Sequence, residues 1–297
     1  MLNKIRQFFK FLKKFHFLYI FKGFFKLHGV FYFYYKKWYA APSLRQSQIL
    51  KSYVTSNNLY HQREGAPNYF LNKIRRNGSV ILDIGGNLGY SALHYSRILE
   101  GIDSTVCFSF EPVSSNFSKM IFNFGHLKNI FFLNFGISED AKILKFGLPD
   151  FFDNSDEHNS GLYTSKNVNS NFLTEECRVF SLDSFINFLN LENETIQYIK
   201  IDIEGSELEA ICGASNVLEN HNPVIQIEYN PNANSHDEFA KIINNLSSLK
   251  YYPYKTKSSF DESNGFEVFF IKNESLDSFR KEEDFNRLFE PALFKFN

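Results

Sequence analysis

The sequence predicts an α/β fold whose mostly parallel sheet has seven strands, the last of them antiparallel. Three observations support this prediction. From about residue 66 onward, short runs rich in Val, Ile and Phe alternate with segments of helical periodicity. A glycine-rich turn follows the first run directly. Two apolar runs near the C-terminus lie close enough in sequence to form an antiparallel pair. Such alternation is typical of a parallel sheet covered by helices on both faces.

The first half of the pattern is centred on the glycine turn. The predicted elements, in order, are a helix over 66–77, the strand VILDI over 80–84, a helix over 90–99, the strand TVCFSFEP over 105–112, a helix over 114–125 and the strand NIFFLNFGI over 129–137.

The second half begins with a polar, Asn- and Ser-rich insertion at 147–176. The elements that follow are a short strand and a helix within 177–189, the strand IQYIKIDIEG over 196–205, one helix over 206–219, the strand PVIQIEYN over 223–230, a helix near 236–249, the antiparallel runs 251–258 and 265–273, and a helical tail over 276–297. The main domain is expected to span 45–275.

The charge distribution separates an N-terminal arm, 1–44, from this domain. Of the 32 Lys and Arg residues, 12 precede Glu64, which is the first acidic residue. The other 20 accompany all 33 acidic residues, a balance of −13. Lysines interrupt the aromatic arm too often for a bilayer-spanning helix or a secretory signal. The three cysteines are widely spaced, which favours a reducing, cytoplasmic environment over disulfides or zinc.

Helical spacing in the arm predicts an amphipathic helix with a basic face. Its apolar face would carry Ile5, Phe8, Phe9, Leu12 and Phe15, and its basic face Arg6, Lys10, Lys13 and Lys14. Such a helix fits an anionic membrane surface, here at the inner face of the membrane, through residues 1–40. Docking on the protein's own core or on a partner subunit is the alternative. The density of Phe argues against nucleic acid as a partner.

The turn after the first strand reads DIGGNLG, with Asp83, Gly85, Gly86, Asn87 and Gly89. A dinucleotide-binding turn would read G-x-G-x-x-G. The observed D-x-G-x-x-x-G spacing is typical of enzymes that use S-adenosylmethionine. By itself the turn could also serve only close packing and positive φ angles.

Glu111 strengthens the cofactor interpretation because it ends the second predicted strand. One carboxylate at a strand end can accept hydrogen bonds from both hydroxyl groups of a ribose.

Several segments together resemble the FkbM family of methyltransferases. They are VILDIGGNLGYSAL, FSFEP, SLDSF, YIKIDIEGSELEAICGA and VIQIEYN, and the resemblance covers roughly 65–275. It implies a Rossmann-like class I methyltransferase fold, S-adenosylmethionine as cofactor, and a hydroxyl of a sugar, glycan or related metabolite as acceptor. It further implies that Asp83, Gly85, Asn87 and Gly89 line the cofactor's methionine end. Glu111 would bind the ribose, and Gly136 and Ile137 would lie near the adenine. At Gly86 the family more often has alanine.

The candidate catalytic residues lie at the end of the fourth strand. Lys200, Asp202 and Glu204 alternate and therefore point to one side of it. We expect Asp202 to act as general base or to orient the acceptor near the cofactor, with Glu204 and Glu228 as further candidates. A buried ionic network is the structural alternative. These acids could hold Mg²⁺, although their spacing does not demand it. Further candidate bases are His94, His158 and His236.

Other functions receive less support from the sequence. N-methylation of amides or adenine usually accompanies an N-P-P-Y motif, whereas Asn230-Pro231 precedes Asn232 here. The acidic body disfavours RNA. An NAD-linked enzyme is disfavoured by the glycine spacing. A catalytically inactive, membrane-tethered scaffold that keeps the fold is the second hypothesis.

Overall fold

The structure is a computed structural model of the 297-residue chain. It describes residues 24–27, 30–35, 37–41, 44–55, 65–74, 78–102, 104–148, 173–229, 236–257 and 266–294. The chain divides into two compact units, 1–57 with 151–160, and 58–150 with 161–297. Among the described helices, none combines the length and the apolar character needed to cross a bilayer.

The first unit contains a small antiparallel sheet followed by a helix. Its elements are β1 (Phe24–Leu27), β2 (Val30–Tyr35), β3 (Lys37–Ala41) and α2 (Leu44–Thr55). The prediction of a helical arm is wrong for 24–41, because runs of Phe, Tyr and Val favour extended backbone. The amphipathic helix predicted around 5–15 lies outside the described residues.

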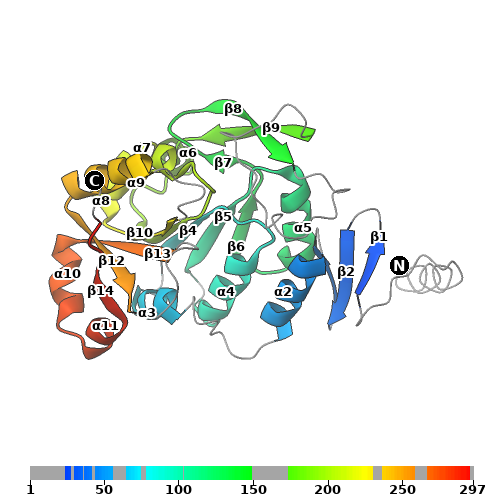
Figure 1. Ribbon diagram of the computed structural model, residues 1–297, viewed down its shortest axis with the longest axis horizontal. Coiled ribbons are helices and arrows are strands. Elements are labelled where there is room, and N and C mark those ends of the chain that lie inside the picture. The colour runs from blue at the N-terminus through cyan, green and yellow to red at the C-terminus, as the bar shows by residue number, and fades with distance from the viewer. Residues whose placement is uncertain are drawn as a thin grey trace, which may run out of the picture. The chain divides into compact units, whose positions relative to one another are not determined.

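An eight-stranded sheet forms the centre of the second unit (Figure 1). Its order is β14-β12-β13-β11-β10-β4-β5-β6, and β6, β5, β4, β10 and β11 run parallel. The strands are β4 (Ser79–Ile84), β5 (Val106–Phe110), β6 (Ile130–Leu133), β10 (Thr195–Ile201), β11 (Val224–Tyr229), β12 (Tyr251–Thr256), β13 (Phe266–Lys272) and β14 (Phe289–Pro291).

The antiparallel strand near the C-terminus is confirmed as β13, which pairs with both β11 and β12. The sequence predicted seven strands, and the eighth, β14, adds to the edge beside β12. Within the predicted tail, α10 (Asn273–Arg280) and α11 (Glu283–Leu288) are helical before this short strand. β14 was missed because three residues, one of them proline, carry no recognisable strand pattern.

Helices cover both faces of the sheet (Figure 1). The residues that the two faces carry differ. The apolar face, represented by Ile84, Phe110, Ile201 and Ile227, packs against α6 (Leu182–Phe188), α7 (Glu207–Cys212), α8 (Ser215–His221) and α9 (His236–Ser248).

The opposite face, which we call the polar face, carries Asp83, Ser109, Lys200 and Gln226 among apolar neighbours. It packs against α3 (Gly65–Ile74), α4 (Tyr90–Ile98), α10 and α11. Helix α5 (Ser114–Phe124) contacts this side through Met120, near Ser109.

A second, three-stranded sheet contains β7 (Gly136–Ile137), β8 (Lys142–Leu148) and β9 (Leu173–Phe180) in the order β7-β9-β8. The single strand predicted over 129–137 is therefore two strands in two sheets. Asn134 explains the interruption, because its side-chain amide donates to the carbonyls of Glu111 (3.0 Å) and Pro112 (3.1 Å). Both ends of the predicted polar insertion are strands, and 149–172 lie outside the described residues.

The helix predicted over 206–219 is also divided, into α7 and α8. The break occurs at Gly213, where a Cβ would come within 2.1 Å of the Ser138 carbonyl oxygen. A loop from another part of the chain thus approaches the helix backbone directly. Periodicity in the sequence does not report such a contact.

Candidate functional site

The candidate site lies where β4 and β10, neighbours in the sheet, reach their carboxyl ends. The chain continues from β4 to β5 on one side and from β10 to β11 on the other. In open parallel sheets this reversal of strand order creates the crevice in which ligands bind. The predicted cofactor turn follows β4, and the predicted catalytic residues follow β10 and β11.

The turn after β4 is held by hydrogen bonds to β5. The amides of Gly85 and Gly86 both donate to the Phe110 carbonyl, at 3.0 and 2.8 Å. Gly85 has φ +98°, and a Cβ there would lie 1.9 Å from the Asp202 carbonyl oxygen. Only glycine fits this position. The predicted cofactor turn and the strand end that carries the predicted catalytic residues therefore approach each other through their backbones.

Glu111 lies beside the same turn and is 5% exposed. Its Oε2 accepts from the amide of Asn87 (2.9 Å) and its Oε1 from the amide of Val113 (3.0 Å). The Asn116 side chain is a third donor to this carboxylate, which has about four acceptor sites and so keeps room for one further donor. Burial raises the pKa of Glu111 to about 7, although both amides oppose this shift.

Asp83 lies within β4 on the polar face and is fully buried. Its Oδ2 accepts from the Ser109 hydroxyl at 2.7 Å, and it is the register partner of Lys200 on β10. Burial raises the pKa of the Asp83 carboxyl, and the charge of Lys200 acts against that shift. Asp83 therefore lies inside the sheet, behind the turn.

Lys200 and Asp202 form an ion pair, with Nζ 2.7 Å from Oδ2. Burial alone would lower the pKa of Lys200, but Asp202, Asp83 and Glu267 together raise it. For Asp202, burial raises the pKa, and Lys200 outweighs this and lowers it. Asp202 is therefore an ionised carboxylate next to a charged lysine.

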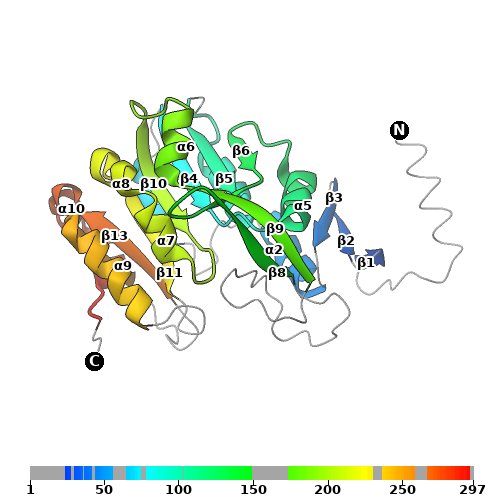
Figure 2. The ribbon, with the colours of Figure 1, turned by 90° about the horizontal axis from the view of Figure 1, so that it is seen from above.

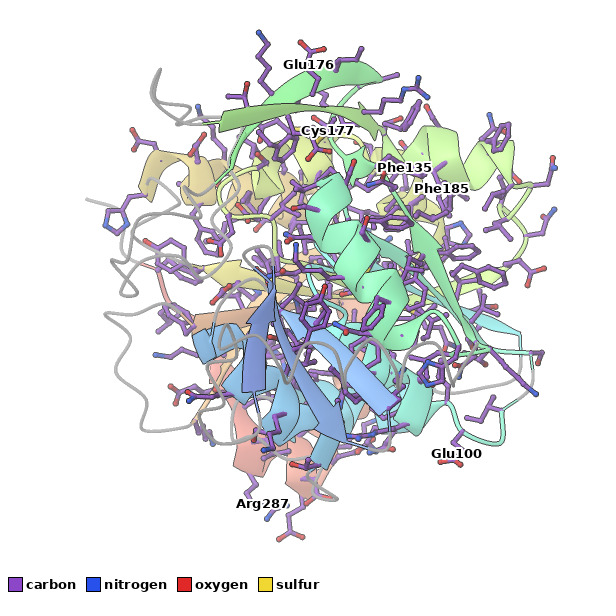
Figure 3. All side chains as sticks on the ribbon, turned by 90° about the vertical axis from the view of Figure 1, so that its right-hand side faces the viewer. Glu100, Phe135, Glu176, Cys177, Phe185 and Arg287 are labelled. Atoms are coloured by element: carbon purple, nitrogen blue, oxygen red, sulfur yellow. The ribbon has the colours of Figure 1, made fainter. Side chains whose placement is uncertain are left out.

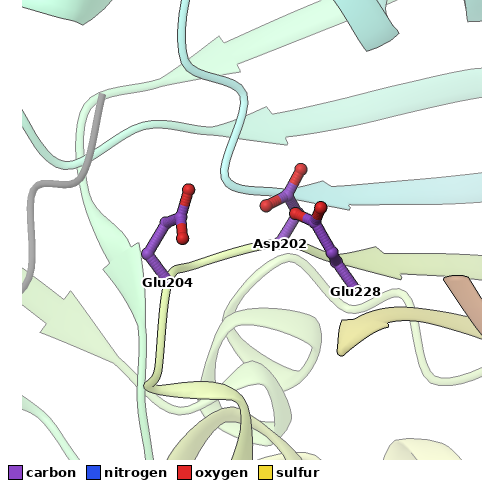
Figure 4. Close-up of side chains that lie close together, drawn as sticks. All are labelled: Asp202, Glu204 and Glu228. Carbon is purple, nitrogen blue, oxygen red and sulfur yellow. The ribbon is translucent and has the colours of Figure 1, made fainter. Parts of the chain in front are cut away.

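Glu204 and Glu228 approach Asp202 from two sides (Figure 4). One carboxylate oxygen from each of the three residues lies within 4.8 Å of the others. Burial, Asp202 and Glu267 raise the pKa of Glu228 to about 9. Burial, Asp202 and Glu207 raise the pKa of Glu204 to about 7. Asp202 is thus the acid among the three that stays ionised at neutral pH.

Glu204 is held by an unusual backbone conformation, with φ +54°. The turn that contains it is fixed by Glu207, whose Oε1 accepts from the amides of Ile203 (3.2 Å) and Gly205 (3.1 Å). The Glu204 Oε2 is buried and has no hydrogen-bond partner among the described residues. Mg²⁺ is bound by oxygen ligands of this type, so the three carboxyl groups could hold the Mg²⁺ that the sequence allowed but did not demand.

The remaining predicted residues lie in different environments. Gly136 and Ile137 form β7, and the Ile137 side chain is 4% exposed within the core, so only backbone atoms there could contact a ligand. Burial and Arg97 lower the pKa of His94 to about 4, which leaves it a neutral, buried residue of α4. His236 lies 2.8 Å from the Tyr229 hydroxyl through Nδ1. His158 lies outside the described residues.

Three further residues at the candidate site were not predicted from the sequence. Glu267 on β13 is directly opposite Glu228, and strand pairing could have revealed it. Ser109 bonds Asp83, and its alternation with Phe108 and Phe110 was a usable signal. Lys119 of α5 is 8% exposed and lies near enough to Glu111 for their charges to interact; nothing in the sequence pattern indicated this.

The aromatic cluster around Phe110 supports the site from the apolar face. Phe135 and Phe185, labelled in Figure 3, lie 5.8 Å apart by ring centroids, and Phe110 contacts both, at 5.4 and 5.0 Å. Because Phe110 also accepts both glycine amides, this cluster fixes the turn from behind.

Comparison with known proteins identifies related sequences and folds. The sequence model of the methyltransferase FkbM domain matches residues 83–254. No match was found among the curated proteins.

Similar solved structures include a methyltransferase FkbM from Methylobacillus flagellatus KT, with 19% identity and TM-score 0.44 over 68% of this chain and 46% of that one. An S-adenosylmethionine-dependent O-methyltransferase from Thermotoga maritima has 10% identity and TM-score 0.43 over 84% of each chain. An rRNA methylase from Streptococcus thermophilus has 12% identity and TM-score 0.40 over 71% and 97%. The chain thus spans less than half the length of the first of these structures.

Proposed function

The chain belongs to the FkbM family of methyltransferases, and we propose that it moves a methyl group from S-adenosylmethionine to a hydroxyl oxygen of a sugar, glycan or related metabolite. The observation that carries this proposal is the contact between the two halves of the site. The cofactor turn touches the Asp202 backbone at Gly85, and the Asp202 side chain is the ionised member of the acidic cluster.

The residues present fit the cofactor. Glu111 directly follows β5, is buried beside the turn and keeps an acceptor site for a ribose hydroxyl beyond its bonds from Asn87, Val113 and Asn116. The turn at 85–89 would hold the methionine end, and the backbone at Gly136-Ile137 would lie near the adenine. Asp83 is fully buried behind this turn, so it would not contact the cofactor directly as the resemblance implied. When bound, S-adenosylmethionine supplies a methyl group that is already activated for attack.

Asp202 is the residue we assign to proton transfer. Its carboxylate would accept the proton of the acceptor hydroxyl, because Lys200 keeps it ionised at neutral pH. Glu228, protonated up to about pH 9, would orient Asp202, and Glu204 would bind a second hydroxyl of the acceptor through its unpartnered oxygen. The protein's tasks are then alignment, exclusion of water and removal of one proton.

Calorimetric titration of the full chain with S-adenosylmethionine tests the cofactor first. We expect micromolar binding that Glu111→Ala weakens by about 2 kcal/mol, since it removes a charged acceptor. Glu194→Gln, in an exposed loop, is the matched control. Absence of binding by folded protein would contradict the proposal. A screen of saccharide acceptors, with Asp202→Asn as the inactive variant, then tests oxygen transfer.

We further propose that residues 1–40 hold the enzyme at an anionic membrane surface, at the cytoplasmic face, near a lipid-linked acceptor. The support is the run of lysines and aromatics in the sequence. Deleting the segment would remove β1–β3, so replacement of Lys10, Lys13 and Lys14 by Ser in the full chain is the sharper test. Flotation with vesicles containing phosphatidylglycerol should show binding that this triple variant loses. Unchanged binding of the triple variant to these vesicles would contradict the proposed membrane contact.

A further inference from the structure

The first turn of α5 carries a buried asparagine beside the carboxylate that we assign to the ribose. Helix α5 lies next to β6, at the edge of the large sheet (Figure 2). Asn116 is 1% exposed, although asparagine is mostly found at protein surfaces. Met120 follows four positions later, on the same side of the helix. A Cβ at Gly86 would lie 3.0 Å from the Met120 sulfur, so this side of α5 packs on the cofactor turn.

The Asn116 side chain donates a hydrogen bond to the Glu111 carboxylate. Its Oδ1 is buried and has no hydrogen-bond partner among the described residues. Burying an amide with one end unsatisfied costs free energy, and asparagine is also a weak helix former. The stability of α5 therefore does not explain this residue, whereas the bond to Glu111 does.

Three donors hold the Glu111 carboxylate from two sides. The Asn87 amide belongs to the cofactor turn and bonds Oε2, while the Val113 amide and the Asn116 side chain come from the start of α5. A carboxylate has about four acceptor sites, so these donors leave one site open. Because the turn and the helix pack together, the direction of the open site is fixed. Without Asn116, two sites would be open and only the two backbone amides would hold the group.

Three titratable side chains also face Glu111. Asp83 of β4 raises the pKa of Glu111 through its negative charge. Lys119, 8% exposed on α5, interacts with Glu111 through its positive charge. Burial raises the pKa of Cys177 on β9 to about 12, so that thiol is neutral. These three groups act on Glu111 through charge or burial, whereas Asn116 contributes a directed hydrogen bond.

We propose that Asn116 is a positioning residue of the cofactor site. By filling one acceptor site of Glu111, it fixes the direction in which the last site is offered to a ribose hydroxyl. The inference rests on the proposed function for the identity of the cofactor. It also orders the variants at this position. Leucine removes the donor, and aspartate, which has the shape of asparagine, adds repulsion between two carboxylates.

Calorimetry with S-adenosylmethionine at pH 8 measures the effect on the cofactor. Asn116→Leu should bind about tenfold more weakly than the wild type, and Asn116→Asp more weakly still. In the Glu111→Gln background, Asn116→Leu should change the affinity by less than about threefold, because the carboxylate that it positions is gone. Wild-type affinity of Asn116→Leu, or an equal loss in both backgrounds, would overturn the proposal.

Asn123→Leu is the matched control. It replaces another buried asparagine of α5, about 10 Å further along the helix axis, and should bind the cofactor as the wild type does.

The ionisation of Glu111 provides a test that needs no cofactor. Carboxyl-carbon NMR of the glutamate-labelled full chain, assigned with Glu111→Gln, follows its titration near pH 7. A donor stabilises the ionised form, so the midpoint should rise in Asn116→Leu, rise further in Asn116→Asp and stay unchanged in Asn123→Leu. An unchanged midpoint in both Asn116 variants would overturn the proposal. If this order holds while the wild type binds no S-adenosylmethionine, the proposed function fails and the role of Asn116 at Glu111 stands.

Discussion

The two faces of the central sheet differ most at equivalent positions of the same strands. Near the end of four parallel strands, an apolar residue faces one side of the sheet and the polar residue next to it faces the other. These pairs are Ile84 and Asp83 on β4, Phe110 and Ser109 on β5, Ile201 and Lys200 on β10, and Ile227 and Gln226 on β11. The first of each pair is at most 1% exposed and packs in an apolar core. The second is a polar residue directed to the opposite face.

The two faces of this sheet therefore contribute differently to stability and to the candidate site. Burying a charged or polar group costs free energy unless it is paired, so the polar face adds less to stability than an apolar face would. Asp83 and Lys200 are paired with Ser109 and Asp202, which limits that cost. Both faces bury apolar side chains against helices, and the polar face in addition carries the charged groups of the candidate site.

The largest effect is expected on the apolar face. Phe110→Ala should lower the free energy of unfolding by about 3–5 kcal/mol, because it leaves a cavity beside Phe135 and Phe185. Urea denaturation measures the loss. Phe131→Ala, the exposed control, should cost about 1 kcal/mol or less. If Phe110→Ala and Phe131→Ala lose the same free energy of unfolding, burial of Phe110 on the apolar face does not contribute the expected stability.

The next largest effect concerns catalysis. Asp202→Asn should lower methyl transfer about 100-fold or more, because an amide cannot accept the proton of the acceptor. Its affinity for S-adenosylmethionine should change by less than about threefold. Single-turnover assays and calorimetry measure the two quantities. If the affinity falls in parallel with the rate, Asp202 serves the cofactor rather than the acceptor.

A smaller effect is expected at Glu111. Its ionised carboxylate accepts hydroxyl donors, and its pKa of about 7 means that protonation begins near neutrality. The affinity of the wild type for S-adenosylmethionine should therefore rise as the pH increases through about 7. Glu111→Gln should bind about 10- to 100-fold more weakly at pH 8 and show a flat profile. Calorimetric titrations with S-adenosylmethionine at several pH values make this measurement. If the affinity of Glu111→Gln depends on pH as that of the wild type does, the prediction is wrong.

The smallest effect is on the pH dependence of stability. Glu228 has its pKa raised to about 9 from 4.5, so the folded chain binds a proton that the unfolded chain releases in this interval. Stability should accordingly fall as the pH rises from about 5 to 9. Glu228→Gln should remove part of this slope and gain on the order of 1 kcal/mol at pH 9. Thermal unfolding across this pH range is the measurement, and an unchanged slope would contradict the assignment.

Much of the fold was predictable because the parallel strands are short, continuous apolar runs. β4, β5, β10 and β11 all lie close to the predicted strands, and the turn with Gly85 follows β4 as expected. The failures share one cause, which is contact between parts of the chain distant in sequence. Gly213 divides a helix because the Ser138 carbonyl lies against it, and Asn134 ends β6 by bonding residues 111 and 112.

The candidate site was predictable to a similar degree. Motif spacing singled out Asp202, Glu204 and Glu228, which the structure brings together at one edge. Which of them stays ionised was not predictable, since that depends on Lys200 and on Glu267, which reaches the cluster through pairing of β13 with β11. Burial removed His94 from the candidate bases, and an isolated sequence does not report burial of a histidine.

The approach of Gly85 to the Asp202 carbonyl limits how this gene can vary. Every other amino acid carries a Cβ, and here that atom would lie 1.9 Å from a backbone oxygen. Gly78 also has a positive φ, of 80°, but open space surrounds it. In a saturation library selected for folded protein, codon 78 should tolerate some substitutions, Asn foremost, at a cost of about 1–2 kcal/mol for the positive φ, whereas codon 85 should return glycine alone.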